Sequence, residues 1–213
     1  MVRWIGRARF AEAEQVAARF GMGERNTYRR LRGLVRLSLL EHQRVFHAQP
    51  GAYLATVAGL RTAGLRLPGP RLDIRTYRHD QVATEVLIGL EREFGRQAVV
   101  TERELRARDC GSPERPRYAV RRGVQRTRRG LHFPDLAVES GGDGPLVVEV
   151  ELSAKGTARL NSIIGAYVRA RHLAAVRYYA SPLALAGVVR AVARAHAQEL
   201  IEIRVLEEER CSQ

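Results

Sequence analysis

The sequence predicts an α/β fold in two parts, with a small N-terminal domain of helices and one hairpin followed by a larger domain built on a mixed sheet. Three observations support this. Amphipathic helical periodicity dominates the start of the chain, a proline-containing stretch interrupts it at 66–74, and strand-like runs alternate with long helices from residue 131 onward. The 213 residues suffice for two modest cores. We therefore expect domains at 1–65 and 75–213, joined by a linker at 66–74.

The composition is strongly basic. The 36 Arg and Lys residues outnumber the 23 Asp and Glu residues and give a formal net charge of +13, which favours a polyanionic partner, nucleic acid first. The first residues lack the apolar core of a signal peptide and no long apolar run follows, so we expect a soluble, cytoplasmic protein with no membrane partner. Cys110 and Cys211 have no C-x-x-C spacing, so neither a zinc site nor a disulfide framework is expected.

Two amphipathic helices are predicted near the N-terminus. Residues 11–20 place apolar side chains on one face, and Gly21 is a suitable C-terminal stop. In residues 25–40 the apolar side chains recur at three- and four-residue steps, while arginines fall largely on the other side. Two helices joined by a short glycine-containing turn, the second of them basic, match a helix-turn-helix whose second helix enters the major groove.

A short hairpin is predicted next, with strands over 44–49 and 52–57 separated by Pro50 and Gly51. It would be the wing of a winged helix-turn-helix that binds double-stranded DNA. The residues expected to contact DNA are Arg25, Asn26, Tyr28, Arg29 and Arg30 on the second helix and Arg44 and His47 on the wing. Which of them read bases is left open, as is the alternative that an arginine-rich helix face is simply solvated.

Helices and strands alternate after the linker. A helix is expected over 79–94 with Asp80 as its N-cap, an interpretation preferred to a metal-binding His79–Asp80 pair because further ligands are lacking. Residues 106–130 are expected to form an irregular basic loop. The other elements expected are a strand near Val99, strands over 131–139 and 145–153 joined by a turn at 140–144, a helix over 158–172, a strand over 174–180, a helix over 182–200 and a strand over 201–206.

Three carboxylates occur inside the strand pair. Glu149 and Glu151 alternate with valines and so share one face of their strand, and Asp135 on the preceding strand can lie beside them. Carboxylates that converge without a partner are costly to bury, and a divalent cation would relieve the repulsion. Oxygen ligands of this kind suit Mg²⁺ or Mn²⁺. Lys155, the single lysine of the chain, follows four residues after Glu151, where a compact ammonium could serve chemistry or occur by chance.

These residues resemble the PD-(D/E)XK nuclease fold, with Pro134-Asp135 on one strand and Glu149-Val150-Glu151 on the next. That family usually carries lysine where this chain has Glu151, so the resemblance implies either that Lys155 is a migrated lysine or that the site is inactive. From the predicted winged helix to the VEVELSAK segment, the chain also looks like the replication-relaxation proteins of actinobacterial plasmids and integrated mobile elements. This second resemblance implies DNA binding linked to plasmid replication or mobilisation.

Three interpretations of the acidic residues stay open. The first is an ordinary hairpin with outward-facing carboxylates, the second an active Mg²⁺-dependent DNA endonuclease, and the third a degenerate nuclease fold in a DNA-binding regulator. In the active case Asp135 and Glu149 would ligate the metal, Glu151 would be a third ligand or orient the water, and Lys155 would stabilise the phosphate. A homodimer also stays open. The contacts considered on the following helix are Arg159, Asn161, Tyr167 and Arg169, with Tyr167 assigned to the core, and one of Tyr178 and Tyr179 is expected to be buried.

Overall fold

The chain divides into two compact units, Met1–Gly95 and Arg96–Gln213, in a computed structural model that describes every residue except 48, 112–114, 124–129, 140, 143 and 208–213. Helices and a mixed sheet are both present, which confirms the predicted α/β class. No helix in the described part of the chain has the length and apolar character needed to cross a membrane.

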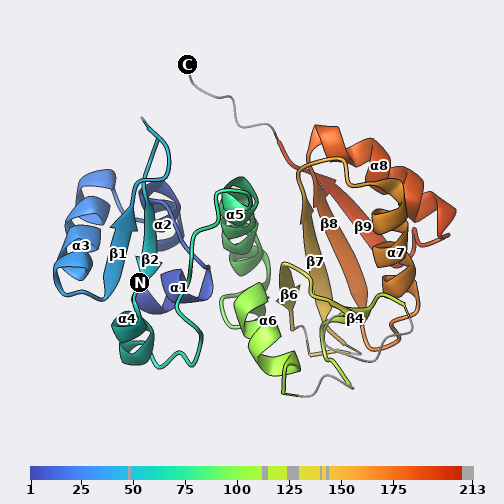
Figure 1. Ribbon diagram of the computed structural model, residues 1–213, viewed down its shortest axis with the longest axis horizontal. Coiled ribbons are helices and arrows are strands. Elements are labelled where there is room, and N and C mark those ends of the chain that lie inside the picture. The colour runs from blue at the N-terminus through green and yellow to red at the C-terminus, as the bar shows by residue number, and fades with distance from the viewer. Residues whose placement is uncertain (48, 112–114, 124–129, 140, 143, 208–213) are drawn as a thin grey trace. The chain divides into compact units, whose positions relative to one another are not determined.

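The first unit contains five helices and one hairpin among its described residues (Figure 1). They are α1 (Val2–Arg7), α2 (Ala13–Phe20), α3 (Glu24–Arg36), β1 (Leu40–Gln43), β2 (Ala52–Ala55), α4 (Val57–Thr62) and α5 (Tyr77–Phe94). The turn between α2 and α3 begins at Gly21, whose φ of 63° is left-handed, so the predicted glycine stop is confirmed. Helix α3 buries Thr27 and Leu31, and it ends at Arg36, earlier than expected.

The hairpin differs from the prediction in the position of its first strand. β1 and β2 pair antiparallel, with Leu40 opposite Ala55 and Gln43 opposite Ala52, so Arg44 and His47 lie in the connecting loop. Residues 44–49 alternate like a strand, but Val45 packs against the Phe10 cluster and Phe46 contacts the Tyr77 ring at a centroid separation of 5.3 Å. These apolar contacts take the segment away from the sheet, so the strand expected over 44–49 was wrong.

Helix α5 belongs to the first unit, whereas the sequence prediction placed it in the second domain. Tyr77 stacks on Phe10 with a centroid separation of 4.7 Å, and its hydroxyl donates to Glu12 Oε1 at 2.9 Å. Buried Glu91 forms ion pairs with Arg7 and Arg19. The boundary between the compact units therefore falls after Gly95 instead of at 66–74.

The start of α5 was also predicted incorrectly. Thr76 is the N-cap, and Asp80 lies inside the first turn, where it accepts a hydrogen bond from Thr76 Oγ1 at 3.1 Å. An acidic side chain in the first turn is favourable because it lies near the positive end of the helix dipole, which explains why Asp80 looked like a cap in the sequence.

The second unit is a five-stranded sheet in the order β3-β6-β7-β8-β9. Strand β6 runs antiparallel to both of its neighbours, β3 and β7, whereas β7, β8 and β9 run parallel to one another. The elements are β3 (Val99–Thr101), α6 (Glu102–Asp109), β4 (Val120–Arg121), β5 (Leu131–His132), β6 (Leu136–Val138), β7 (Leu146–Glu151), α7 (Thr157–Val168), β8 (Ala175–Ala180), α8 (Pro182–Arg194) and β9 (Ile201–Val205). The antiparallel pairing of β6 with β7 was predicted and is confirmed.

Helices α7 and α8 cover one face of this sheet (Figure 1). Helix α7 connects β7 to β8, and α8 connects β8 to β9. Crossovers between parallel strands are nearly always right-handed, which places two successive crossover helices on the same face of the sheet. Their apolar side chains pack on the sheet residues Val147, Val176 and Tyr178. The strand side chains that point toward α7 and α8 are therefore buried, and they include Glu149 and Glu151 of β7.

The basic stretch at 106–130 is more ordered than predicted where it is described. Helix α6 runs to Asp109, and β4 pairs with β5 so that Val120 lies opposite His132. The buried carboxylate of Asp109 accepts hydrogen bonds from the backbone N–H groups of residues 117–119. A single buried acid thus orders this chain segment by satisfying its donors, a long-range role that composition does not reveal. Residues 112–114 and 124–129 of the predicted loop lie outside the described residues.

Candidate nucleic-acid interface and acidic cluster

Helix α3 presents a row of arginines on its solvent face. Arg25, Arg29, Arg32 and Arg36 are all exposed and follow one another at steps of three and four residues. Such spacing places side chains on one helix face, opposite the buried Thr27 and Leu31. Among the described residues, none of the four forms an ion pair with an acidic side chain. We call these four residues the α3 arginine row, and their charges are available to an anionic partner.

The other predicted α3 residues lie on the flanks of this row. Tyr28 is half-buried, and it lies near enough to Tyr53 of β2 to contribute to the raised pKa of Tyr53. Burial is the largest cause of this raised pKa. Tyr28 raises the pKa of Tyr53 further, and the charge of Arg32 lowers it. Arg30 and Asn26 are exposed on the other flank, and the Arg30 charge helps to lower the pKa of the Met1 amino group, after burial and Arg19.

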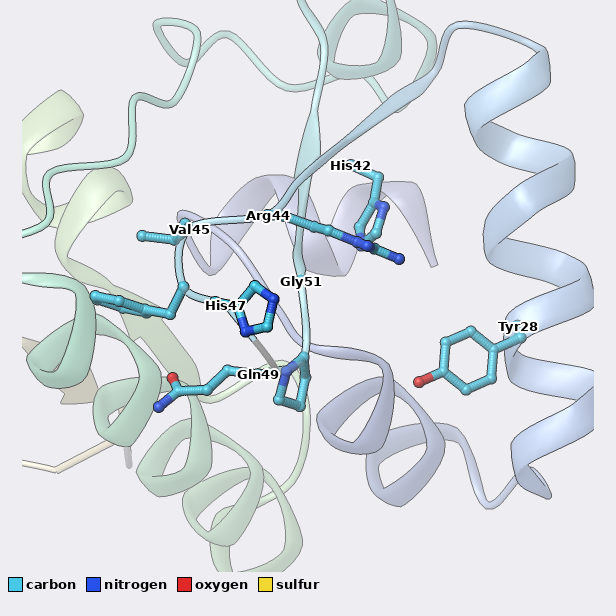
Figure 2. Close-up of a pocket in the computed structure, with 9 residues that line it drawn as sticks. Tyr28, His42, Arg44, Val45, His47, Gln49 and Gly51 are labelled. Atoms are coloured by element: carbon cyan, nitrogen blue, oxygen red, sulfur yellow. The ribbon is translucent and has the colours of Figure 1, made fainter.

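A cleft of about 650 Å³ lies between α3 and the β1–β2 loop (Figure 2). Tyr28 points into it from α3, and Arg44 and His47 line it from the loop. His42 stacks on Tyr53 with a centroid separation of 4.4 Å. A Cβ on Gly51 would lie 2.1 Å from His42 Nε2, so a side chain at this position would displace the imidazole ring. The cleft brings together the predicted residues Tyr28, Arg44 and His47.

The sequence prediction missed several side chains of this surface. Arg32 and Arg36 extend the arginine row beyond the first turns of α3, and His42 and Gln49 line the cleft. The signal that could have added the two arginines was the helical spacing, because Arg32 follows Arg29 by three residues and Arg36 follows Arg32 by four. His42 had no such signal because its strand was placed too late in the sequence.

The two glutamates of β7, Glu149 and Glu151, lie on the face of the sheet that α7 and α8 cover. Glu149 and Glu151 are each only 3% exposed, so the interpretation as an ordinary hairpin with outward-facing carboxylates is wrong. In the register of β7 with β8, Glu149 lies opposite Tyr178. Burial is the largest cause of the raised pKa of Tyr178, and the charges of Glu149, Glu151 and Asp135 raise it further. The three predicted carboxylates therefore gather beside one tyrosine, and we call them the acidic cluster.

Glu149 is held by two partners from different elements. His132 Nε2 lies 2.7 Å from Glu149 Oε1, and the Tyr167 hydroxyl of α7 donates to the same oxygen. Burial alone raises the pKa of Glu149, but the charge and hydrogen bond of His132, the Tyr167 hydrogen bond and the charge of Lys155 together hold it below its usual range. Glu149 is therefore a buried carboxylate that its neighbours keep ionised.

The other two carboxylates also have partners. Lys155 Nζ forms an ion pair with Glu151 Oε2, and both side chains are largely buried, with 22% and 4% of their areas exposed. Asp135 accepts a hydrogen bond at 2.7 Å from the backbone N–H of Val150, which lies between the two glutamates in sequence. The single lysine of the chain thus pairs with one carboxylate of the acidic cluster, Glu151, a role that was not predicted from the sequence.

The arrangement does not fit a divalent-metal centre as the side chains stand. In the described part of the chain, no group of three or more His, Cys, Asp or Glu side chains is placed to hold a metal ion. Histidine, tyrosine and lysine engage the glutamate oxygens instead. Two buried atoms point the other way: among the described residues the Tyr178 hydroxyl has no hydrogen-bond partner, and Glu151 Oε2 has its ion pair with Lys155 but accepts no hydrogen bond.

Two tyrosines in this cluster give a matched stability prediction. Tyr178→Phe is expected to stabilise the second unit by about 1 kcal/mol, because a buried hydroxyl without a partner carries a desolvation cost. Tyr167→Phe removes a hydrogen bond to a buried carboxylate and is expected to destabilise it by about 2 kcal/mol. Urea unfolding followed by circular dichroism measures both, and equal effects of the two substitutions would contradict the geometry.

Acid pH is expected to weaken the second unit through Glu149. Its pKa in the folded state lies below the ordinary value of 4.5, so the stability it contributes is complete above that value and is lost as pH falls through the lower folded pKa. Glu149→Gln removes this contribution. Unfolding midpoints measured at steps from about pH 6 to about pH 3 should show wild type above the variant near neutrality, with the two curves converging in acid. Parallel curves would rule out this role.

Comparisons of the chain with protein-family models, with curated proteins and with solved structures returned no match.

Proposed function

We propose that this protein binds double-stranded DNA through its first unit, acting as a winged helix-turn-helix. The α3 arginine row is the observation that carries the proposal. It combines four exposed arginines on one helix face with a basic hairpin loop beside them, and both lie within one compact unit. A solvated helix face needs no such neighbour, whereas a recognition helix and wing contact adjacent phosphates.

Within this proposal, α3 enters the major groove and the β1–β2 loop contacts the backbone. Arg25 and Arg29 lie in the first turns, the part of a recognition helix that reaches base edges. Arginine bonds guanine through two donors, which gives these positions a means of reading sequence. Arg44 and His47 are placed for phosphate contacts, and Tyr28 stands in the cleft between the two elements.

The second unit is proposed to be a nuclease-like scaffold without catalytic function. Its antiparallel strands β3, β6 and β7 followed by parallel β8 support a PD-(D/E)XK-like fold, and the pairing of its two buried glutamates with His132 and Lys155 supports the absence of chemistry. A cleaving site of that kind needs its lysine free to contact phosphate, and Lys155 is paired with Glu151 instead. The protein would then be a DNA-binding regulator or accessory factor of the replication-relaxation type.

A metal-dependent DNA endonuclease is the second candidate function. The unpartnered Tyr178 hydroxyl and the gathering of Asp135 and Glu149 beside it favour this alternative. It requires His132 and Lys155 to release the carboxylates when Mg²⁺ or Mn²⁺ and DNA bind together. The two functions share the first unit and differ in whether the acidic cluster opens.

One experiment tests both candidates. Purified protein is incubated with supercoiled and linear DNA in Mg²⁺, in Mn²⁺ and in EDTA, and band shift and cleavage are followed together. The proposal predicts a band shift under all three conditions without cleavage. Cleavage that needs metal and disappears in Asp135→Ala would establish the nuclease instead, and the absence of any band shift would contradict DNA binding.

A further inference from the structure

The second unit contains a basic pocket outside the acidic cluster. It has a volume of about 450 Å³ and lies between β4 and the C-terminal end of α7. The described residues of its lining include Arg115, Arg121 and Arg169 together with His172, and none of those described is an aspartate or glutamate. The size falls in the range of small-molecule pockets, and the charge favours an anion.

The arginines of this pocket are placed on its rim. Arg115 and Arg169 are exposed, and neither forms an ion pair with an acidic side chain within the part of the chain that is described. Arg169 Nη1 lies 3.3 Å from the position that a Cβ of Gly165 would occupy, so its guanidinium folds back along α7 beside Ala166 of the floor. The absence of a side chain at Gly165 gives the guanidinium this space.

The floor of the pocket is apolar and fixed. Ala119, Val120 and Ala166 are at most 3% exposed and belong to buried parts of the second unit. His172 forms a hydrogen bond with the Ala119 backbone, which ties the segment after α7 to the β4 region. Small aliphatic side chains under a rim of guanidinium groups match a ligand that has a flat, weakly polar part and an anionic part.

We infer that this pocket binds a nucleotide with an unpaired base, its phosphate on the arginines of the rim and its base against the half-buried Pro116 and Ala170 above the alanine and valine floor. Guanidinium groups bind phosphate through paired hydrogen bonds and also stack on bases. A concave site of this size can hold one nucleotide, but it is too small to hold a base-paired duplex. The nucleotide could be free or part of a single strand, and this inference does not rest on the duplex-binding function of α3.

The arginines have an alternative role, because basic side chains near a helix C-terminus also stabilise the helix through its dipole. That role affects stability and leaves ligand binding unchanged. The experiment therefore measures both quantities, in full-length protein that carries Arg25→Ala and Arg29→Ala so that the contribution of α3 to nucleic-acid binding is reduced.

Titration calorimetry with dAMP and fluorescence anisotropy with labelled single-stranded dT10 are the two binding arms. Arg169→Glu is expected to weaken binding by about ten-fold or more, as loss of a charge-assisted contact implies. Arg190→Glu, on the exposed surface of α8, makes the same change of charge outside the pocket and should leave binding unchanged. Arg115→Glu is the second pocket variant, should Arg169→Glu fail to fold.

Each outcome has a defined meaning. Saturable binding of dAMP supports a free nucleotide as the ligand, and binding of dT10 without dAMP supports a strand. Equal loss in Arg169→Glu and Arg190→Glu, or no saturable binding of either probe, overturns the inference. Inorganic phosphate or a glutamate heptapeptide that binds as tightly as dAMP also overturns it, because the base then contributes nothing. A fall in melting temperature with unchanged binding assigns the arginines to the helix and overturns it as well.

Discussion

Replacing Arg25 and Arg29 together with alanine is expected to weaken duplex binding by about a hundred-fold, because an arginine at a DNA interface typically contributes about 1–3 kcal/mol. Both side chains lie in the α3 arginine row, exposed and without an ion-pair partner among the described residues. Arginines that neutralise phosphates also contribute to the salt dependence of affinity. The slope of log affinity against log salt should therefore fall by about one for each phosphate-contacting arginine removed. Fluorescence anisotropy over a range of salt concentrations measures both quantities.

The control for this experiment removes the same charge elsewhere in the first unit. Arg66 and Arg78 are exposed and lie outside α3 and the hairpin. The variant Arg66→Ala/Arg78→Ala should keep most of the affinity if α3 is the interface. Equal losses in the two double variants would mean that only net charge matters, and the assignment of α3 would then be wrong.

Replacing His132 with alanine is expected to destabilise the second unit by about 3 kcal/mol. His132 is a side-chain partner of Glu149, which is 3% exposed, and its Nε2 lies 2.7 Å from Glu149 Oε1. Removal of one member of a buried pair leaves the other charge uncompensated, which usually costs about 3–5 kcal/mol. Protonation of Glu149 limits this cost, so the loss should shrink toward acid pH. Urea unfolding followed by circular dichroism is the appropriate measurement, since Trp4 reports on the first unit only.

A second substitution separates the lost charge partner from lost packing. His132→Ala/Glu149→Gln no longer carries the buried charge and should recover much of the stability that His132→Ala loses. A double variant as unstable as the sum of the two single variants would show that His132 and Glu149 act independently. That result would contradict the assignment of His132 as the side chain that stabilises the buried charge of Glu149.

Local patterns predicted most elements of the second unit. Strands β7 and β8 have apolar runs of their own, and α8 has both Pro182 at its start and a helical period, so its position needs no long-range information. The strand expected over 44–49 failed for a tertiary reason. Its alternation is real, but Val45 and Phe46 satisfy it by packing on Phe10 and Tyr77 instead of pairing in a sheet.

The domain boundary was misplaced because its cause is non-local. The proline-containing segment at 66–74 is irregular, as predicted, yet the chain returns afterwards to the first unit. The contact of Tyr77 with Glu12 joins residues 65 positions apart in sequence. Composition shows where a chain is irregular, but it does not show which core the next helix joins.

The candidate sites were predictable in type and only partly in detail. Alternation in β7 correctly placed Glu149 and Glu151 on one face, and the sole lysine proved to lie beside Glu151. Nothing local indicated that His132 reaches Glu149, since His132 belongs to the separate strand pair β4–β5, and its contact with β7 is a tertiary one. Partners that engage a buried acid come from tertiary structure, so a sequence pattern that predicts a cluster of carboxylates does not predict what holds them.

Hydrogen exchange of the full-length protein, with and without a duplex oligonucleotide, tests the central proposal most directly. It reports which backbone segments a ligand covers or stabilises, in the unmodified chain. The proposal predicts slower exchange in α3 and in the β1–β2 hairpin, with the acidic strand β7 unchanged. Protection confined to the second unit, or none in α3 at a duplex concentration that saturates binding, would contradict it.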